Sequence, residues 1–151
     1  MSQRHLDGFP VIVQQAVVWG DMDSYQHVNN TVYFRYFENA RLEYFRQMGW
    51  FDYEDRTGVG PILAATSARF RKALAYPDTI SVGVRVTDRA DDRFNMEYRL
   101  VSHKLDAIAT EGTGMVVTMH YKEGRKVPIP EEVWQMVIRL EGREPPRTQR
   151  N

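Results

Sequence analysis

The sequence predicts an α+β fold in which an antiparallel sheet of about five strands curls around one long buried helix. Residues 31–48 have the length and composition of a helix and are apolar around most of its circumference. One valine-rich segment precedes this helix, and four strand-like segments with short connections follow it. Short connections favour antiparallel pairing, and one curled sheet is a simple way to bury an apolar helix.

The first two elements are a strand and the long helix. Residues 11–19 read VIVQQAVVW, which is typical of a strand. A polar loop follows, and then Tyr33, Phe37, Ala40 and Tyr44 recur at helical spacing. Gly49 is a residue type that commonly ends a helix. We therefore expect a buried helix over residues 31–48.

The second half of the chain predicts four strands and a short helix. The strand segments are residues 61–78, 79–88, 93–103 and 107–121. In the first of them Ala68 and Phe70 alternate with Arg69 and Arg71, as in a half-buried strand. Pro130 opens a short C-terminal helix that ends near Gly142. We expect a single domain over residues 1–142 and a disordered tail over residues 143–151, which are polar and proline-rich.

The composition argues against several classes of function. The 20 basic and 20 acidic residues balance, which gives no electrostatic argument for binding nucleic acid. Cysteine is absent, so neither disulfides nor thiolate nucleophiles are available. No apolar run suits a signal peptide or a membrane span, and we expect a cytoplasmic protein. His5, His103 and His120 lack metal-ligand spacing, so we expect no metal site and no cofactor.

A dense polar cluster lies immediately before the long helix. Its members are Asp21, Asp23, His27, Asn29 and Asn30. The first N–H groups of a helix have no intrahelical partner and carry the positive end of the helix dipole. The cluster could therefore cap the helix, or it could form an active site that uses those N–H groups.

The same stretch carries a family pattern in register. The matching positions are Asp23, His27-Val28, Asn29-Asn30, Tyr33, Phe37-Glu38 and Ala40-Arg41. In these residues the sequence resembles the hotdog-fold acyl-CoA thioesterases of the 4-hydroxybenzoyl-CoA thioesterase type, and the resemblance extends over most of residues 11–120. It implies a hotdog fold, hydrolysis of a thioester, and a catalytic carboxylate at Asp23.

Two departures limit what the resemblance implies. Plant acyl-carrier-protein thioesterases have a similar loop with an asparagine where this chain has Tyr25. Some relatives place basic residues for CoA phosphates where this chain has Asp91 and Asp92. The catalytic network of the plant enzymes therefore does not transfer whole, and phosphate recognition must come from elsewhere.

The resemblance and the chemistry together suggest roles for the candidate site residues. Without cysteine or a serine–histidine signature, Asp23 is the natural nucleophile or general base. The Asn30 N–H could stabilise the oxyanion at the helix N-terminus, with His27 as a third catalytic candidate. The candidate substrate-binding residues are Tyr33, Arg69, Arg71 and Lys72. The last three could bind CoA phosphates.

Structural roles are the alternative for each of these residues. Asp23 could simply occupy a turn, and Asp21 is better explained as structural. His27 could order the loop or bind substrate, and Asn29 could cap the helix. The remaining candidates also have structural alternatives. Glu38 and Arg41 could form an ion pair on the helix surface, and Tyr33, Tyr36 and Tyr44 could pack in the core. Arg69, Arg71 and Lys72 could lie on a solvated strand face.

The sequence thus predicts an enzyme that hydrolyses a thioester of CoA or of acyl carrier protein. We expect a homodimer or homotetramer, because the rest of the sheet face and its edges need a cover. One alternative is a hotdog enoyl-CoA hydratase or dehydratase, but the Asn-Pro step of those enzymes is absent. The other alternative is a non-catalytic acyl-CoA-binding module.

Overall fold

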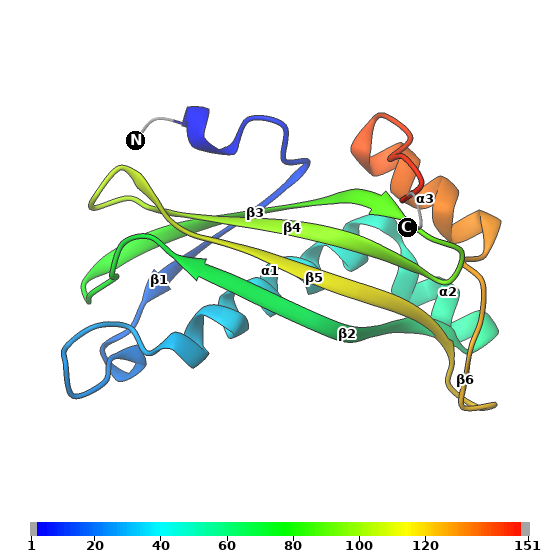
Figure 1. Cartoon of the computed structure of the whole chain (residues 1–151), viewed down its shortest axis with the longest axis horizontal. Coiled ribbons are helices and arrows are strands. Elements are labelled where there is room, and N and C mark those ends of the chain that lie inside the picture. Colours follow the sequence, from blue (N-terminus) through cyan, green and yellow to red (C-terminus); the bar gives the residue numbers. More distant parts are fainter. Residues whose placement is uncertain (1–2, 149–151) are drawn as a thin grey trace.

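The computed structural model describes residues 3–148, which form one sheet with its helices (Figure 1). The strands are β1 (Val11–Val17), β2 (Val59–Phe70), β3 (Asp78–Arg89), β4 (Arg93–Ser102), β5 (Ala107–His120) and the short β6 (Arg125–Lys126). The helices are α1 (Asn30–Met48), α2 (Trp50–Thr57) and α3 (Glu131–Glu141), with the 3₁₀ turns η1 (Gln3–Leu6) and η2 (Trp19–Asp21).

The sheet is antiparallel throughout, with the strand order β1-β3-β4-β5-β2 and β6 paired to β5. The predicted α+β class and curled antiparallel sheet are confirmed. The short connection expected after β2 does not join neighbouring strands, because β2 pairs with β5 at one edge while β3 lies near the other. Residues 71–77 therefore cross between the strands, and this crossing forms one wall of the site described below.

Helix α1 packs along one face of the sheet and forms the centre of the core (Figure 1). Tyr33, Phe37, Ala40 and Tyr44, the residues that predicted the helix, are all buried. The helix begins where the Asn29 side-chain oxygen accepts the Thr31 N–H at 2.9 Å. It ends at Gly49, whose φ of 96° is a left-handed conformation that favours glycine. The predicted cap and stop are both confirmed.

A second helix, which the sequence did not lead us to expect, follows Gly49 directly. Helix α2 buries Trp50 in the core, and its indole N–H donates to the Val59 carbonyl at 3.2 Å. Helix α3 matches the predicted C-terminal helix. The Glu141 carboxylate at its end accepts the Tyr44 hydroxyl at 2.7 Å and the Val86 N–H at 2.9 Å. One carboxylate thus joins α3 to α1 and to β3.

The other face of the sheet is partly covered by the N-terminal segment. Leu6 and Phe9 pack on Val101, and the Phe9 ring lies beneath the Arg85 guanidinium at 4.3 Å. Residues 143–148, the first part of the tail for which we expect disorder, follow α3 and contact the end of β3. Arg89 hydrogen-bonds through its backbone to Pro146 and Thr148. Residues 149–151 of the expected tail lie outside the described residues.

Arg41 also differs from the surface role expected of it. Its guanidinium lies 4.0 Å from the Glu38 carboxylate, so the predicted ion pair is present. The residue is only 8% exposed, however, and it donates to the Tyr98 hydroxyl at 3.0 Å. This arginine is therefore a buried link between α1 and β4, and only its Glu38 partner is at the surface.

Candidate active site

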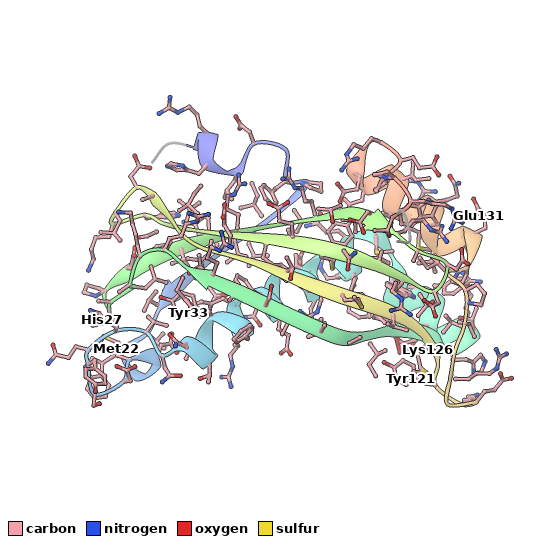
Figure 2. The ribbon with its side chains drawn as sticks, viewed as in Figure 1. Met22, His27, Tyr33, Tyr121, Lys126 and Glu131 are labelled. Atoms are coloured by element: carbon pink, nitrogen blue, oxygen red, sulfur yellow. The ribbon has the colours of Figure 1, made fainter. Side chains whose placement is uncertain are left out.

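A cavity of about 300 Å³ opens at the end of the molecule where α1 begins. Figure 2 shows His27 and Tyr33 at this end, with Tyr121 and Glu131 at the opposite end. The lining residues come from the loop before α1, the first turns of α1, and the end of β2 with the crossing segment after it: Asp23, Tyr25, His27, Val28, Asn30, Tyr33, Phe70, Arg71, Lys72 and Ala73. The cavity therefore collects six of the seven predicted site residues.

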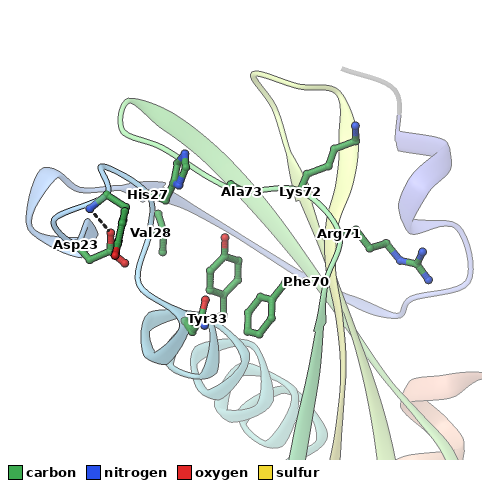
Figure 3. Close-up of a pocket in the computed structure, with 10 residues that line it drawn as sticks. Asp23, His27, Val28, Tyr33, Phe70, Arg71, Lys72 and Ala73 are labelled. Atoms are coloured by element: carbon green, nitrogen blue, oxygen red, sulfur yellow. Dashed lines mark hydrogen bonds between the residues drawn. The ribbon is translucent and has the colours of Figure 1, made fainter.

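The loop before α1 is a tight turn held by its own backbone. The Asp23 N–H donates to the His27 carbonyl, and the Gln26 N–H donates to the Asp23 carbonyl, both at 2.9 Å. Gln26 has a φ of 62°, which lets the chain reverse between Asp23 and His27. The Val28 N–H then bonds to the Leu74 carbonyl at 2.8 Å and ties the loop to the crossing segment. These bonds bring the Asp23 and His27 side chains to the same cavity (Figure 3).

The Asp23 carboxylate has one oxygen in the turn and one oxygen free. Its Oδ1 accepts the Tyr25 N–H at 2.9 Å, the dashed bond in Figure 3. Its Oδ2 has no hydrogen-bond partner within residues 3–148. The turn role considered for Asp23 is therefore real, and it leaves the second oxygen available to a ligand. A hydrogen bond to one carboxylate oxygen fixes the orientation of the group and leaves the other oxygen able to react.

Asp21 is bound into the framework and does not line the cavity. Its Oδ2 accepts the Tyr36 hydroxyl at 2.7 Å and the Val18 N–H at 3.1 Å. Burial of the ring, followed by the bond to Asp21, raises the pKa of Tyr36 well above its usual range. The structural role expected for Asp21 fits these contacts.

The first turn of α1 presents a backbone donor, the Asn30 N–H, that is unpaired within residues 3–148. Asn29 satisfies its neighbours, because its side chain accepts the Thr31 N–H and its carbonyl accepts the Val32 N–H at 2.9 Å. The Asn30 N–H has no recorded partner in the described part of the chain, and Asn30 lines the cavity. The helix therefore offers this N–H, together with the positive end of its dipole, to a bound anion or carbonyl.

Tyr33 and Phe70 form the apolar floor of the cavity. Their rings meet edge to face with centroids 4.9 Å apart. Tyr33 is 2% exposed, and its hydroxyl oxygen accepts the Leu74 N–H at 3.3 Å. Burial raises the pKa of Tyr33, so the phenol stays protonated. The alternation of residues 68–71 predicted that Phe70 faces inward, but it did not predict that Phe70 lines the site. Its place in the site depends on the crossing segment, residues 71–77, that follows it.

The three basic residues proposed for phosphate binding are not together. Lys72 lines the cavity, but the Arg71 guanidinium turns away from Asp23 (Figure 3) and pairs with Glu111 at 2.7 Å. Arg69 is outside the cavity, in a second hollow that Glu97 and Glu111 also line. Strand alternation explains the separation, because Ala68 and Phe70 take the face toward α1 while Arg69 takes the other face.

A further hollow adjoins Asp23 on the other side of the loop. It measures about 440 Å³ and is lined by Trp19, Met22, Asp23, Ser24 and Gln26. Trp19 is 73% exposed and Tyr25 is 83% exposed, which is unusual for large aromatic side chains. From the sequence, Trp19 is expected only as the end of a strand, and Tyr25 lies within the polar loop without an assigned role.

The described part of the chain has neither a metal-binding cluster nor a membrane-spanning helix. Among residues 3–148, no three His, Cys, Asp or Glu side chains come close enough together to hold a metal ion. None of the helices in that range is long and apolar enough to cross a membrane.

Comparison with known proteins establishes the family. The model of the thioesterase-like superfamily matches residues 17–137, from the end of β1 into α3. The chain belongs to this superfamily. A thioesterase from Thermus thermophilus, solved in complex with coenzyme A and Zn, is 30% identical with a TM-score of 0.80. The match covers 91% of this thioesterase-like chain and 98% of the Thermus chain.

More distant thioesterases share the fold of this superfamily member. A 1,4-dihydroxy-2-naphthoyl-CoA thioesterase from Synechocystis has a TM-score of 0.73 at 17% identity, over 85% of this chain and 94% of its own. A DHNA-CoA thioesterase from Staphylococcus aureus has a TM-score of 0.74 at 20% identity, over 91% and 98% of the two chains. The fold is the hotdog fold, as the sequence predicted.

Proposed function

We propose that this protein is an acyl-CoA thioesterase that hydrolyses its substrate in the cavity beside Asp23. One observation carries the proposal: the free Asp23 Oδ2 and the unpaired Asn30 N–H face the same cavity. Thioester hydrolysis needs a group that attacks the carbonyl carbon or activates water, and a donor for the developing oxyanion. The bound coenzyme A in the Thermus relative supports CoA as the carrier.

Asp23 can act in either of two ways. As a nucleophile, its carboxylate attacks the carbonyl carbon, the C–S bond breaks to release the CoA thiolate, and water hydrolyses the resulting anhydride. As a general base, it takes a proton from water while the water oxygen attacks the same carbon; the C–S bond then breaks and the CoA thiolate leaves. His27 has a backbone role in the turn, and its imidazole, which has no hydrogen-bond partner within residues 3–148, can bind the substrate near Asp23. The motif order from Asp23 to Arg41 favours the 4-hydroxybenzoyl-CoA thioesterase type within the superfamily.

A panel of acyl-CoAs that differ in chain length and aromaticity tests the proposed function. We expect release of free thiol from at least one member, at a rate that depends on the acyl group. No release from any member would contradict the proposal and favour the acyl-CoA-binding module. Hydration of an enoyl-CoA without thiol release would favour the hydratase alternative.

The basic residues give a separate prediction about the CoA nucleotide. Replacing Lys72 with methionine should raise KM for acyl-CoA roughly three- to tenfold with little change in kcat. The reason is that a contact remote from the reacting carbon binds substrate and transition state alike. Arg69→Met is the matched control, because Arg69 lies outside the cavity. An acyl-pantetheine substrate, which lacks the nucleotide phosphates, should show no such increase for either variant. Equal effects of both substitutions on KM would contradict the phosphate role of Lys72.

We also propose that the protein is a homodimer joined along β2. This strand is an edge of the sheet, and it exposes Ile62 and Leu63 at 40% and 38%. A long exposed edge with apolar side chains is a template for pairing with another chain. We expect Leu63→Lys to shift the protein from dimer to monomer in sedimentation velocity. A wild-type monomer at micromolar concentration would contradict this assembly.

A further inference from the structure

We propose that the Tyr33 hydroxyl donates a hydrogen bond to the thioester carbonyl oxygen and forms, with the Asn30 N–H, a two-donor oxyanion site. This inference rests on the proposed function and adds a specific atom to it. From the sequence, Tyr33 is expected to bind substrate or to pack in the core, with no specific role for its hydroxyl.

The first argument is the hydrogen-bonding pattern of the three buried tyrosines on α1. Tyr36 donates its hydroxyl proton to Asp21, and Tyr44 donates to Glu141, each at 2.7 Å. Tyr33 differs because its oxygen accepts the Leu74 N–H, and no acceptor for its own proton is recorded anywhere in residues 3–148. A buried donor without an acceptor is costly unless a ligand supplies one.

The second argument is direction. Figure 3 shows the Tyr33 ring rising from α1 with its hydroxyl toward the space between His27 and Ala73, both of which line the cavity. Tyr33 follows Asn30 by three residues, so the two lie on the same face of the helix. The proposal places the thioester carbonyl oxygen between these two donors, over the first turn of α1, with the carbonyl carbon toward Asp23.

The third argument is rigidity. Phe70 and Tyr36 contact the Tyr33 ring edge to face, with centroids 4.9 and 6.1 Å away. The Leu74 N–H occupies one lone pair of the hydroxyl oxygen and limits the directions in which the proton can point. A donor that is fixed before the substrate arrives needs no reorganisation during the reaction, which is the condition for effective oxyanion stabilisation.

Tyr33→Phe tests the inference, with Tyr44→Phe as the control. Each substitution removes one hydroxyl from a buried ring on α1, and Tyr44 lies far from the cavity beside Glu141. We expect Tyr33→Phe to lower kcat at least about tenfold and to raise KM as well, because the hydroxyl binds the ground-state carbonyl and binds it more strongly as charge develops. Tyr44→Phe should lower the melting temperature and leave kcat near the wild-type value.

Binding of two unreactive analogues separates a direct donor from a structural role. In one analogue a methylene group replaces the sulfur, so the carbonyl remains as a ketone; in the other a thioether lacks the carbonyl. Tyr33→Phe should weaken binding of the ketone by roughly tenfold and leave binding of the thioether unchanged, since only the ketone can accept the hydrogen bond.

The outcomes separate this inference from the proposed function. Wild-type turnover with an equally active Tyr33→Phe variant would overturn the oxyanion role and leave the thioesterase proposal intact. Equal weakening of both analogues would overturn it as well, because the hydroxyl would then only shape the cavity. A wild-type protein that releases thiol from no acyl-CoA would overturn the proposed function, and this inference with it.

Discussion

Replacing Asp23 with asparagine should lower kcat for acyl-CoA hydrolysis at least about 100-fold, because the variant has neither a nucleophilic carboxylate nor a general base. The fold should persist, since an amide oxygen can still accept the Tyr25 N–H that the Asp23 Oδ1 accepts now. Steady-state kinetics on the best acyl-CoA, beside a thermal melt by circular dichroism, would measure both effects.

Asp21→Asn is the matched control for this substitution. Asp21 is two residues away in the same loop, but its carboxylate binds Tyr36 and Val18 instead of facing the cavity. We expect this variant to lose stability by an amount typical of a weakened buried hydrogen bond, about 1 kcal/mol, and to retain most of its turnover. If the two variants lost equal activity with unchanged melting temperatures, Asp23 would not be the reacting carboxylate.

Replacing Asn30 with proline should lower kcat by about 100-fold, the effect expected for the loss of one oxyanion donor. Proline has no N–H and is well tolerated at the first position of a helix, which Asn30 occupies. Asn29 has φ and ψ of −64° and 142°, the extended conformation that a residue before proline prefers. The helix should therefore form normally, and circular dichroism would check this.

Asn30→Ala is the control for the side chain, because it keeps the backbone N–H. We expect its kcat to remain within a few-fold of wild type, because the Asn30 side chain makes no hydrogen bond within residues 3–148. If the proline and alanine variants lost the same activity while both stayed folded, the side chain would be the important group and the backbone donor would lie elsewhere.

The fold could be predicted largely because its strongest sequence signals are local. The apolar spacing of Tyr33, Phe37 and Tyr44 identifies α1, and Asn29 and Gly49 mark its ends by their local chemistry. The pairing of β2 with β5 could not be predicted in this way, because the two strands are separated by β3 and β4. Helix α2 was missed because Gly49 was interpreted only as a stop, whereas it also begins the next helix.

The candidate site was predictable where its residues belong to one loop and one helix. Asp23, His27, Asn30 and Tyr33 lie within eleven consecutive positions, and the structure brings all four to one cavity. The basic residues were less predictable, since their directions depend on distant partners. Arg71 turns toward Glu111, forty positions away, and only the assembled sheet places that carboxylate beside it.

Nor could the sequence reveal the detail that distinguishes Tyr33 from the other tyrosines of α1. All three have helical spacing and apolar surroundings, which predict core packing equally well for each. Their hydroxyl partners, Asp21, Leu74 and Glu141, come from three different parts of the chain. A functional hydroxyl among core tyrosines is therefore recognisable only from its hydrogen bonds in the folded protein.

The central claim is that a thioester binds in the cavity between Asp23 and the start of α1. A crystal structure with the ketone analogue of acyl-CoA tests it most directly. We expect the ketone oxygen within hydrogen-bonding distance of the Asn30 N–H, and the carbonyl carbon facing the free Asp23 Oδ2. An analogue whose carbonyl lies elsewhere, such as in the hollow beside Arg69 on the other face of the sheet, would contradict the claim.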